Sequence, residues 1–365
     1  MAMIDLRLAN SFLLVLFFAY LYVAGFSYAS FIVDSTDNAY LSTIIRVVLI
    51  FSMVFIRSLI GRFSKVDVFI YIFCAVLLAT LNPFLSIVAF MVIVGLIFSD
   101  FVDSKYIVNI ANCISMLCFL TILVLCFLGL SENYTFLDVN DYAKSIRYSL
   151  GFHNPNAASI FVVQSVILFF VYNNNIGKFF SIIISLFTIY YAASRTALFV
   201  GVLFVFLTLF VRSLFIVKVM KLLAVFSLML IPFLLVVFVS NGIWSFSGID
   251  LNQLLSGRLF LVQEFYNMIG GVSLLPSYVD YPLDSGFANI LLKGGLIFYL
   301  IFFVFCCVYL KLESNVKFIF LFFSFLVLLL SENFITGNLL LSVVIMARFI
   351  SLLKSDLVKS KAMVK

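Results

Sequence analysis

Apolar residues fill most of this chain in long runs that short polar segments separate. A helix that spans a membrane needs about 20 predominantly apolar residues, and most of the runs approach that length. They predict about twelve membrane-spanning helices, at 8–32, 41–60, 66–81, 83–99, 106–130, 156–174, 177–193, 196–213, 216–240, 285–310, 316–331 and 333–353. The pattern therefore predicts an all-α integral membrane protein, with residues 1–365 forming a single polytopic membrane domain.

Two boundaries depend on polar residues inside apolar stretches. One unbroken helix over 177–213 would place Arg195 inside the bilayer and would invert the sidedness of every later loop. A break at Ala193–Ser194 keeps basic residues on one side and puts Arg195 at a tight outer turn. The stretch "TLNPF" at 80–84 indicates a second turn or a kink.

Composition and charge agree with this topology. The chain is 65% hydrophobic and 10% charged, against about 25% charged residues in soluble domains. With an inner N-terminus, most of the 22 basic residues fall in inner loops, so the net charge of +6 indicates membrane orientation and no nucleic-acid partner. Both termini are then cytoplasmic. The six cysteines lie in apolar stretches, and we expect neither disulfides nor a metal site.

The polar segments are unequal on the two sides. The long ones, 131–155 and 241–284, both fall on the outer side of the membrane, while the inner loops are short. The chain has no phosphate-binding loop, no dinucleotide fingerprint and no DxD pair, so no cytosolic nucleotide-binding domain is expected. A repeated pair of interrupted helices is also absent from the sequence, which argues against a secondary transporter.

The first outer segment carries a compact group of polar residues. Residues 138–150 predict a short interfacial amphipathic helix that includes Arg147. The "GFHNPN" stretch then turns the chain, and we expect Asn156 to cap the following helix. His153, the only histidine, and Asn154 fit either a plain turn or a binding site.

The second outer segment predicts a helix over 257–269, with Arg258 and Glu264 on or near its polar side. Asp284 directly precedes the span at 285–310 and is expected to cap it. Lys293 lies about two turns inside that span, where a basic residue should face a cavity or a partner.

Arg147, Arg195 and Arg258 therefore share one side of the membrane. Guanidinium groups bind phosphate oxygens bidentately and stay charged. For any one arginine, an anchor for lipid headgroups is an adequate interpretation. Three together favour a site for a lipid-linked phosphate or pyrophosphate.

In chain order, "GFHNPNAAS", "SRTALFVG", "SGRLFLVQE" and "LDSGFANILLKGGLIFY" resemble the O-antigen polymerase and ligase superfamily. The resemblance covers roughly residues 140–300. It implies a bacterial inner-membrane glycosyltransferase of GT-C-type architecture that acts on undecaprenyl-pyrophosphate-linked glycans. Ligases of this kind carry a histidine where this chain has Asp284, so the resemblance favours a polymerase of O-antigen or of a similar surface polysaccharide.

The resemblance also implies roles for the outer residues. Arg195 and Arg258 would hold the leaving pyrophosphate, with a further binding set of Arg147, Asn154, Asn156 and Lys293. Asp284, Glu264 and His153 are candidates, in that order, for the base that deprotonates the acceptor hydroxyl. The donor and acceptor glycans are the expected partners, together with the bilayer and a chain-length regulator. We expect no cofactor and no catalytic metal. An O-antigen ligase, a flippase or other transporter of lipid-linked oligosaccharides, and a non-catalytic scaffold remain alternatives.

Overall fold

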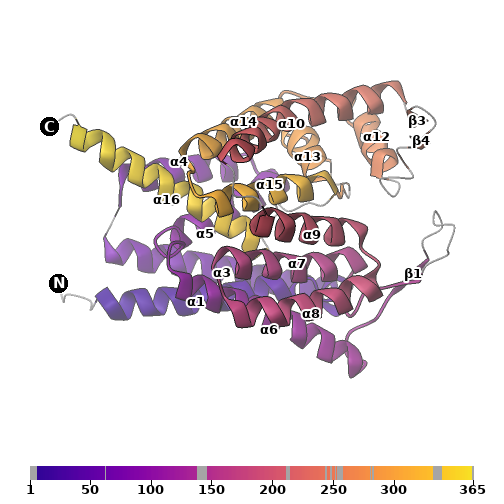
Figure 1. Ribbon diagram of the computed structural model, residues 1–365, viewed down its shortest axis with the longest axis horizontal. Helices are drawn as coiled ribbons and strands as arrows, with labels where there is room; N and C mark the ends of the chain where they lie inside the picture. Colours follow the sequence, from indigo (N-terminus) through magenta and orange to yellow (C-terminus); the bar gives the residue numbers. More distant parts are fainter. Residues whose placement is uncertain are drawn as a thin grey trace. The chain divides into compact units, whose positions relative to one another are not determined.

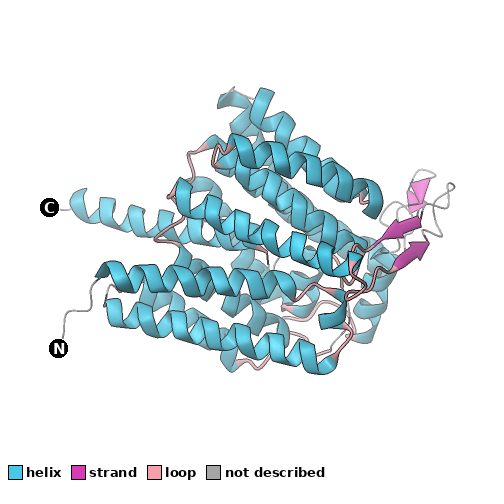
Figure 2. Cartoon of the chain, turned by 90° about the horizontal axis from the view of Figure 1, so that it is seen from below, coloured by secondary structure: helices cyan, strands magenta, loops and turns pink. Residues whose placement is uncertain are grey.

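The computed structural model describes residues 6–61, 63–137, 146–210, 214–242, 245–246, 249–250, 252, 258–279, 281, 283–331 and 339–363. Helices account for most of these residues (Figure 2). Among the described residues, six helices are long and apolar enough to cross a membrane, namely Leu6–Phe26, Thr36–Ile60, Lys105–Phe127, Asn175–Ala192, Phe215–Asn241 and Gly295–Leu312. Four shorter apolar helices accompany them. The prediction of an all-α, multi-pass membrane protein is confirmed.

The chain forms two compact units, each assembled from separate stretches of sequence. The first comprises residues 1–74, 90–205 and 337–365, and the second comprises 75–89 and 206–336. Three helices contribute residues to both, namely α4 (Lys65–Ala79), α5 (Pro83–Phe98) and α9 (Arg195–Phe210).

The first unit is built around α7 (Pro155–Val171), which is buried along almost its whole length. It contacts α6, α8 and α16, while α1 contacts α3 and α6 (Figure 1). The other helices of this unit are α1 (Leu6–Phe26), α2 (Ser30–Val33), α3 (Thr36–Ile60), α6 (Lys105–Phe127), α8 (Asn175–Ala192) and α16 (Leu340–Met363), together with residues 195–205 of α9. A helix that is apolar on every face suits this central position.

The second unit contains α10 (Leu214–Asn241), α12 (Arg258–Met268), α13 (Gly286–Ala288), η1 (Asn289–Lys293), α14 (Gly295–Leu312) and α15 (Val316–Ser331). Pro232 lies inside α10 and has no N–H to give to the carbonyl of Leu228. The hydroxyl of Tyr299, on α14, donates to that carbonyl. The contact joins α14 to α10 at the proline.

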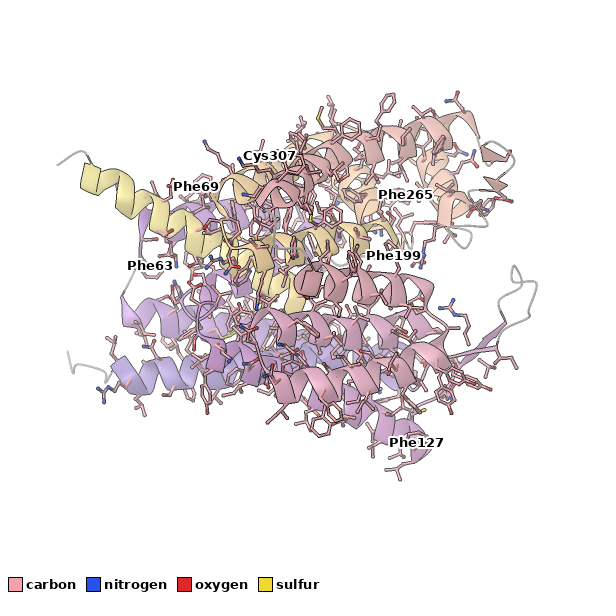
Figure 3. The ribbon with its side chains drawn as sticks, viewed as in Figure 1. Phe63, Phe69, Phe127, Phe199, Phe265 and Cys307 are labelled. Carbon is pink, nitrogen blue, oxygen red and sulfur yellow. The ribbon has the colours of Figure 1, made fainter. Side chains whose placement is uncertain are left out.

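Large apolar side chains point outward along many helices, as the lipid-facing surface of a membrane protein requires. Phe69, Phe127 and Phe199 are labelled examples in Figure 3, and all three are exposed. The six cysteines are free thiols.

Both predicted breaks inside apolar stretches are confirmed. Helix α8 ends at Ala192, Ala193 takes a left-handed conformation with φ 47°, and α9 starts at Arg195. In "TLNPF", Leu81 has φ 55°. The side chain of Asn82 accepts a hydrogen bond from the Leu85 amide at 3.1 Å, and Pro83 opens α5. Asparagine before proline is a favourable start for a helix.

Three local predictions were wrong. Instead of a helix over 138–150, β1 (Thr135–Leu137) pairs antiparallel with β2 (Ile146–Tyr148), and 138–145 lie outside the described residues. The aromatic and β-branched residues of these strands favour cross-strand pairing over helix. Asn154 caps α7 in place of Asn156, because Pro155 occupies its first turn. Ser285 caps α13 in place of Asp284, since its hydroxyl reaches the amide of Ala288.

The predicted span at 285–310 is interrupted. The chain turns from α13 into the π-helical segment η1, bends at Gly294–Gly295 and continues as α14. Gly295 has φ 80°, and a β-carbon there would lie 2.6 Å from the carbonyl oxygen of Leu275. Only glycine suits both this conformation and this close approach.

Candidate functional site

In the first unit, Arg147 joins three parts of the predicted outer region. It lies on β2, and its Nε donates to the carbonyl of Ala192 at 3.0 Å. One terminal nitrogen donates to the Asn156 side chain at 2.6 Å. The C-terminal carbonyls of a helix attract a cation, so Arg147 stabilises the end of α8. The turn that follows leads directly to Arg195, whose side chain lies outside the described residues.

His153 is held by its neighbours. Its Nε2 lies 2.7 Å from the Asn154 amide nitrogen, and its Nδ1 lies 3.3 Å from the Tyr28 carbonyl. The oxygen of Asn154 accepts from the Ala157 amide, so its nitrogen faces the ring and donates to Nε2. The imidazole therefore carries its proton on Nδ1 and donates to Tyr28, on whose ring it also stacks. These contacts join the end of α1 to the start of α7. The hydrogen bond from Asn154 also occupies Nε2, the ring nitrogen that would have to accept a proton if His153 were a general base.

In the second unit, α12 presents Arg258 and Glu264 to the segment before α13. The helix is fixed by Leu259, Val262 and Phe265, which are buried; Phe265 is labelled in Figure 3. Tyr281 lies beside Glu264 and Asp284 lies beside Arg258, so these two residues follow α12 in the opposite direction along the chain.

The Arg258 contact is an ion pair of unequal partners. Its Nε lies 3.5 Å from Oδ2 of Asp284. The arginine side chain is 12% exposed, whereas that of Asp284 is 54% exposed. The pair places a largely buried guanidinium next to a solvated carboxylate.

Glu264 is engaged differently. The Tyr281 hydroxyl donates to its carboxylate, and the Tyr281 ring stacks on Phe265 at 5.8 Å. The hydrogen bond to the carboxylate raises the pKa of Tyr281 above its ordinary value. Tyr281 was absent from the predicted site residues. Its position three residues before Asp284 is the one sequence signal that indicates it.

Lys293 ends the η1 segment, next to a loop that packs into the helix bend. The amide of Leu296 donates to Ser273 at 2.9 Å, and the amide of Ser277 donates to the Lys293 carbonyl at 2.9 Å. Asn82 holds the same loop through a 2.7 Å bond to the Ser277 carbonyl. The 18 residues of α14 extend about 27 Å, close to the thickness of the hydrocarbon core. If α14 crosses the bilayer, Lys293 lies near the membrane boundary and not at its centre.

A second charged cluster, which the sequence did not indicate, lies in the first unit. Asp67 contacts Arg57 at 3.3 Å and Lys354 at 3.0 Å, and Asp100 contacts the same two cations at 2.6 and 3.0 Å. We call these four residues the ion network. Arg57 lies about 30 Å along α3 from its start, at the end away from α2 and the Arg147 hairpin.

The predicted residues thus fall into two groups. Arg147, Asn154, Asn156, His153 and the turn of Arg195 belong to the first unit, and Arg258, Glu264, Asp284 and Lys293 belong to the second. Over the described ranges, no three His, Cys, Asp or Glu side chains lie close enough together to hold a metal ion. No family model, curated protein or solved structure matches this chain in comparisons with known proteins.

Proposed function

We propose that this protein is a polymerase of lipid-linked oligosaccharides in the bacterial inner membrane, with about twelve spans and a GT-C-type architecture. It would join undecaprenyl-pyrophosphate-linked repeat units into O-antigen or a similar surface polysaccharide at the periplasmic face. The observation that carries the proposal is the Arg258–Asp284 pair, a largely buried cation beside an exposed carboxylate. Such a pair offers both charges that transfer of a sugar from pyrophosphate requires.

The reaction needs positive charge at the leaving group. As the bond between the anomeric carbon and the pyrophosphate oxygen breaks, negative charge develops on the pyrophosphate. Arg258, fixed by a packed helix, is positioned to stabilise that charge without reorganisation. In the second unit, Lys293 accompanies Arg258 as a proposed binding residue. In the first unit, Arg147, Arg195, Asn154 and Asn156 are the proposed binding residues for the same kind of oxyanion. The transfer needs no nucleotide or metal.

The reaction also needs a base for the acceptor hydroxyl. Asp284 suits this role better than its rivals because its carboxylate is exposed to incoming substrate. Glu264 is occupied by the Tyr281 hydroxyl, and His153 by Tyr28 and Asn154. A positioned general base of this kind contributes about a hundredfold or more to a rate.

The test is the length distribution of polymer in cells that carry Arg258→Ala or Arg195→Ala, with membrane levels of each variant matched. We expect each substitution to lower polymerisation about a hundredfold, so that single repeats predominate on the finished glycolipid. Arg46→Ala is the matched control, because Arg46 bonds within its own helix to Ser42 and Thr43. Polymer of wild-type length in both variants would refute the pyrophosphate role.

Deletion of the gene separates the alternatives. A polymerase leaves single repeat units on the finished lipopolysaccharide. A ligase, which would join finished polymer to lipid A core, leaves long chains on the lipid carrier. A flippase leaves unpolymerised lipid-linked units at the inner face.

A further inference from the structure

The two partners of the Arg258–Asp284 pair depend on each other unequally. A buried guanidinium needs an anion close to it, whereas an exposed carboxylate is already solvated by water. The separation of 3.5 Å between Arg258 Nε and Asp284 Oδ2 exceeds the roughly 2.7–2.9 Å of a strong hydrogen bond between charged groups. Asp284 is therefore a weakly held counter-ion of an arginine that needs one.

Among the described residues, the surrounding contacts fix the helix that carries the arginine and do not fix the carboxylate. Arg258 begins α12, which is fastened by its buried face and by the bond from Gln263 Nε2 to the Val239 carbonyl. On the other side, Tyr281 is held by Glu264 and Ser285 by its capping bond to Ala288. Asp284 lies between these two anchors. Its side chain can turn into solvent without breaking either of them.

We propose that Asp284 occupies the anion position of Arg258 in the resting protein and that pyrophosphate displaces it on binding. This inference rests on the function proposed above and adds an order of events to it. A pyrophosphate offers several oxygens and more charge than a carboxylate, so it forms the better bidentate partner for a guanidinium. Donor binding then releases Asp284, which becomes available to the acceptor only when a leaving group is in place.

The released carboxylate completes a balanced transfer. The acceptor hydroxyl gives its proton to Asp284, and its oxygen forms a bond to the anomeric carbon of the donor. The bond from that carbon to the pyrophosphate oxygen breaks, and its electron pair leaves with the undecaprenyl pyrophosphate that Arg258 holds. Asp284 afterwards loses the proton to water and returns to Arg258.

Binding of inorganic pyrophosphate to the full chain in phosphatidylcholine nanodiscs tests the exchange. We expect Asp284→Asn to bind pyrophosphate about tenfold more tightly than the wild type, because the competing anion is gone. The same variant should lose polymerisation, since it has no base. Arg258→Gln should bind pyrophosphate more weakly than the wild type. Asp37→Asn, which also removes one exposed carboxylate, is the matched control and should keep wild-type affinity.

Equal affinity of the wild type and Asp284→Asn would overturn the exchange, even if Arg258→Ala abolishes polymerisation and the proposed function stands. If the wild-type protein makes no polymer, tighter pyrophosphate binding by Asp284→Asn would support the exchange while refuting the proposed function. Repeating the measurement with phosphatidylglycerol in the nanodiscs distinguishes the source of the phosphate. Loss of pyrophosphate binding there would mean that a lipid headgroup fills the position, and would overturn a role in donor binding.

Discussion

At the scale of the residue, single side chains satisfy the backbone groups that irregular helices leave over. Pro232 frees the carbonyl of Leu228, and Tyr299 supplies the missing donor. At the bend at Gly294–Gly295 a neighbouring loop does the same with its backbone, since the carbonyls of Ser273 and Leu274 accept from the amides of Leu296 and Ile297. A buried carbonyl without a donor is costly in any apolar interior, and most of all inside a bilayer.

Tyr299→Phe should therefore lower the free energy of unfolding by roughly 1–3 kcal/mol, because the Leu228 carbonyl would stay buried without a partner. Thermal unfolding in detergent measures this. Tyr278→Phe is the control, since the Tyr278 hydroxyl bonds to Thr80 at an exposed position and should contribute less than about 0.5 kcal/mol. Equal melting temperatures for the two variants would contradict the role of Tyr299.

At the scale of the element, helix ends in the first unit are joined by charge. The ion network joins the end of α3, the start of α4, the turn after α5 and the middle of α16. Its two cations and two carboxylates balance, and the Asp67 side chain is only 2% exposed. Breaking a buried pair from one side leaves an uncompensated charge.

We expect Asp67→Asn to destabilise the first unit by about 3–5 kcal/mol, because Arg57 and Lys354 would share Asp100 alone. The rate of backbone amide hydrogen exchange in α16 should also rise in this variant. In Asp103→Asn, which removes an exposed partner of Arg348, the loss should be under about 1 kcal/mol. Unchanged exchange in α16 of the Asp67 variant would show that the ion network does not hold that helix.

At the scale of the whole molecule, the proposed chemistry depends on which side of the membrane the arginines face. Basic residues predict that the turns at Asn174 and Asn315 are cytoplasmic and that Leu130 and Gly271 are periplasmic. Alkaline phosphatase is active only in the periplasm. Fused after Leu130 or Gly271 it should therefore show activity, and fused after Asn174 or Asn315 it should show none. The reverse pattern would place Arg147 and Arg258 in the cytoplasm and would refute the proposed function.

Most helix boundaries followed from the sequence because their causes are local. The breaks at Ala193 and at "TLNPF" could be predicted from loop charge, asparagine and proline. The hairpin at 135–148 could not, because its strands are stabilised by hydrogen bonds to each other and the "DYAKSIRYSL" stretch by itself resembles an amphipathic helix. The bend at Gly294–Gly295 was also missed, because it depends on hydrogen bonds to the loop at 273–277 that the sequence of the span does not reveal.

The sequence by itself thus determined that this is a helical, multi-pass membrane protein and where two breaks fall inside its apolar stretches. The bilayer acts on each apolar segment separately, so composition is enough. Only the tertiary structure decided which charges meet. The pairing of Arg258 with Asp284, the occupation of Glu264 by Tyr281 and the ion network all join residues from different elements. Such contacts depend on packing between helices, which no local pattern specifies.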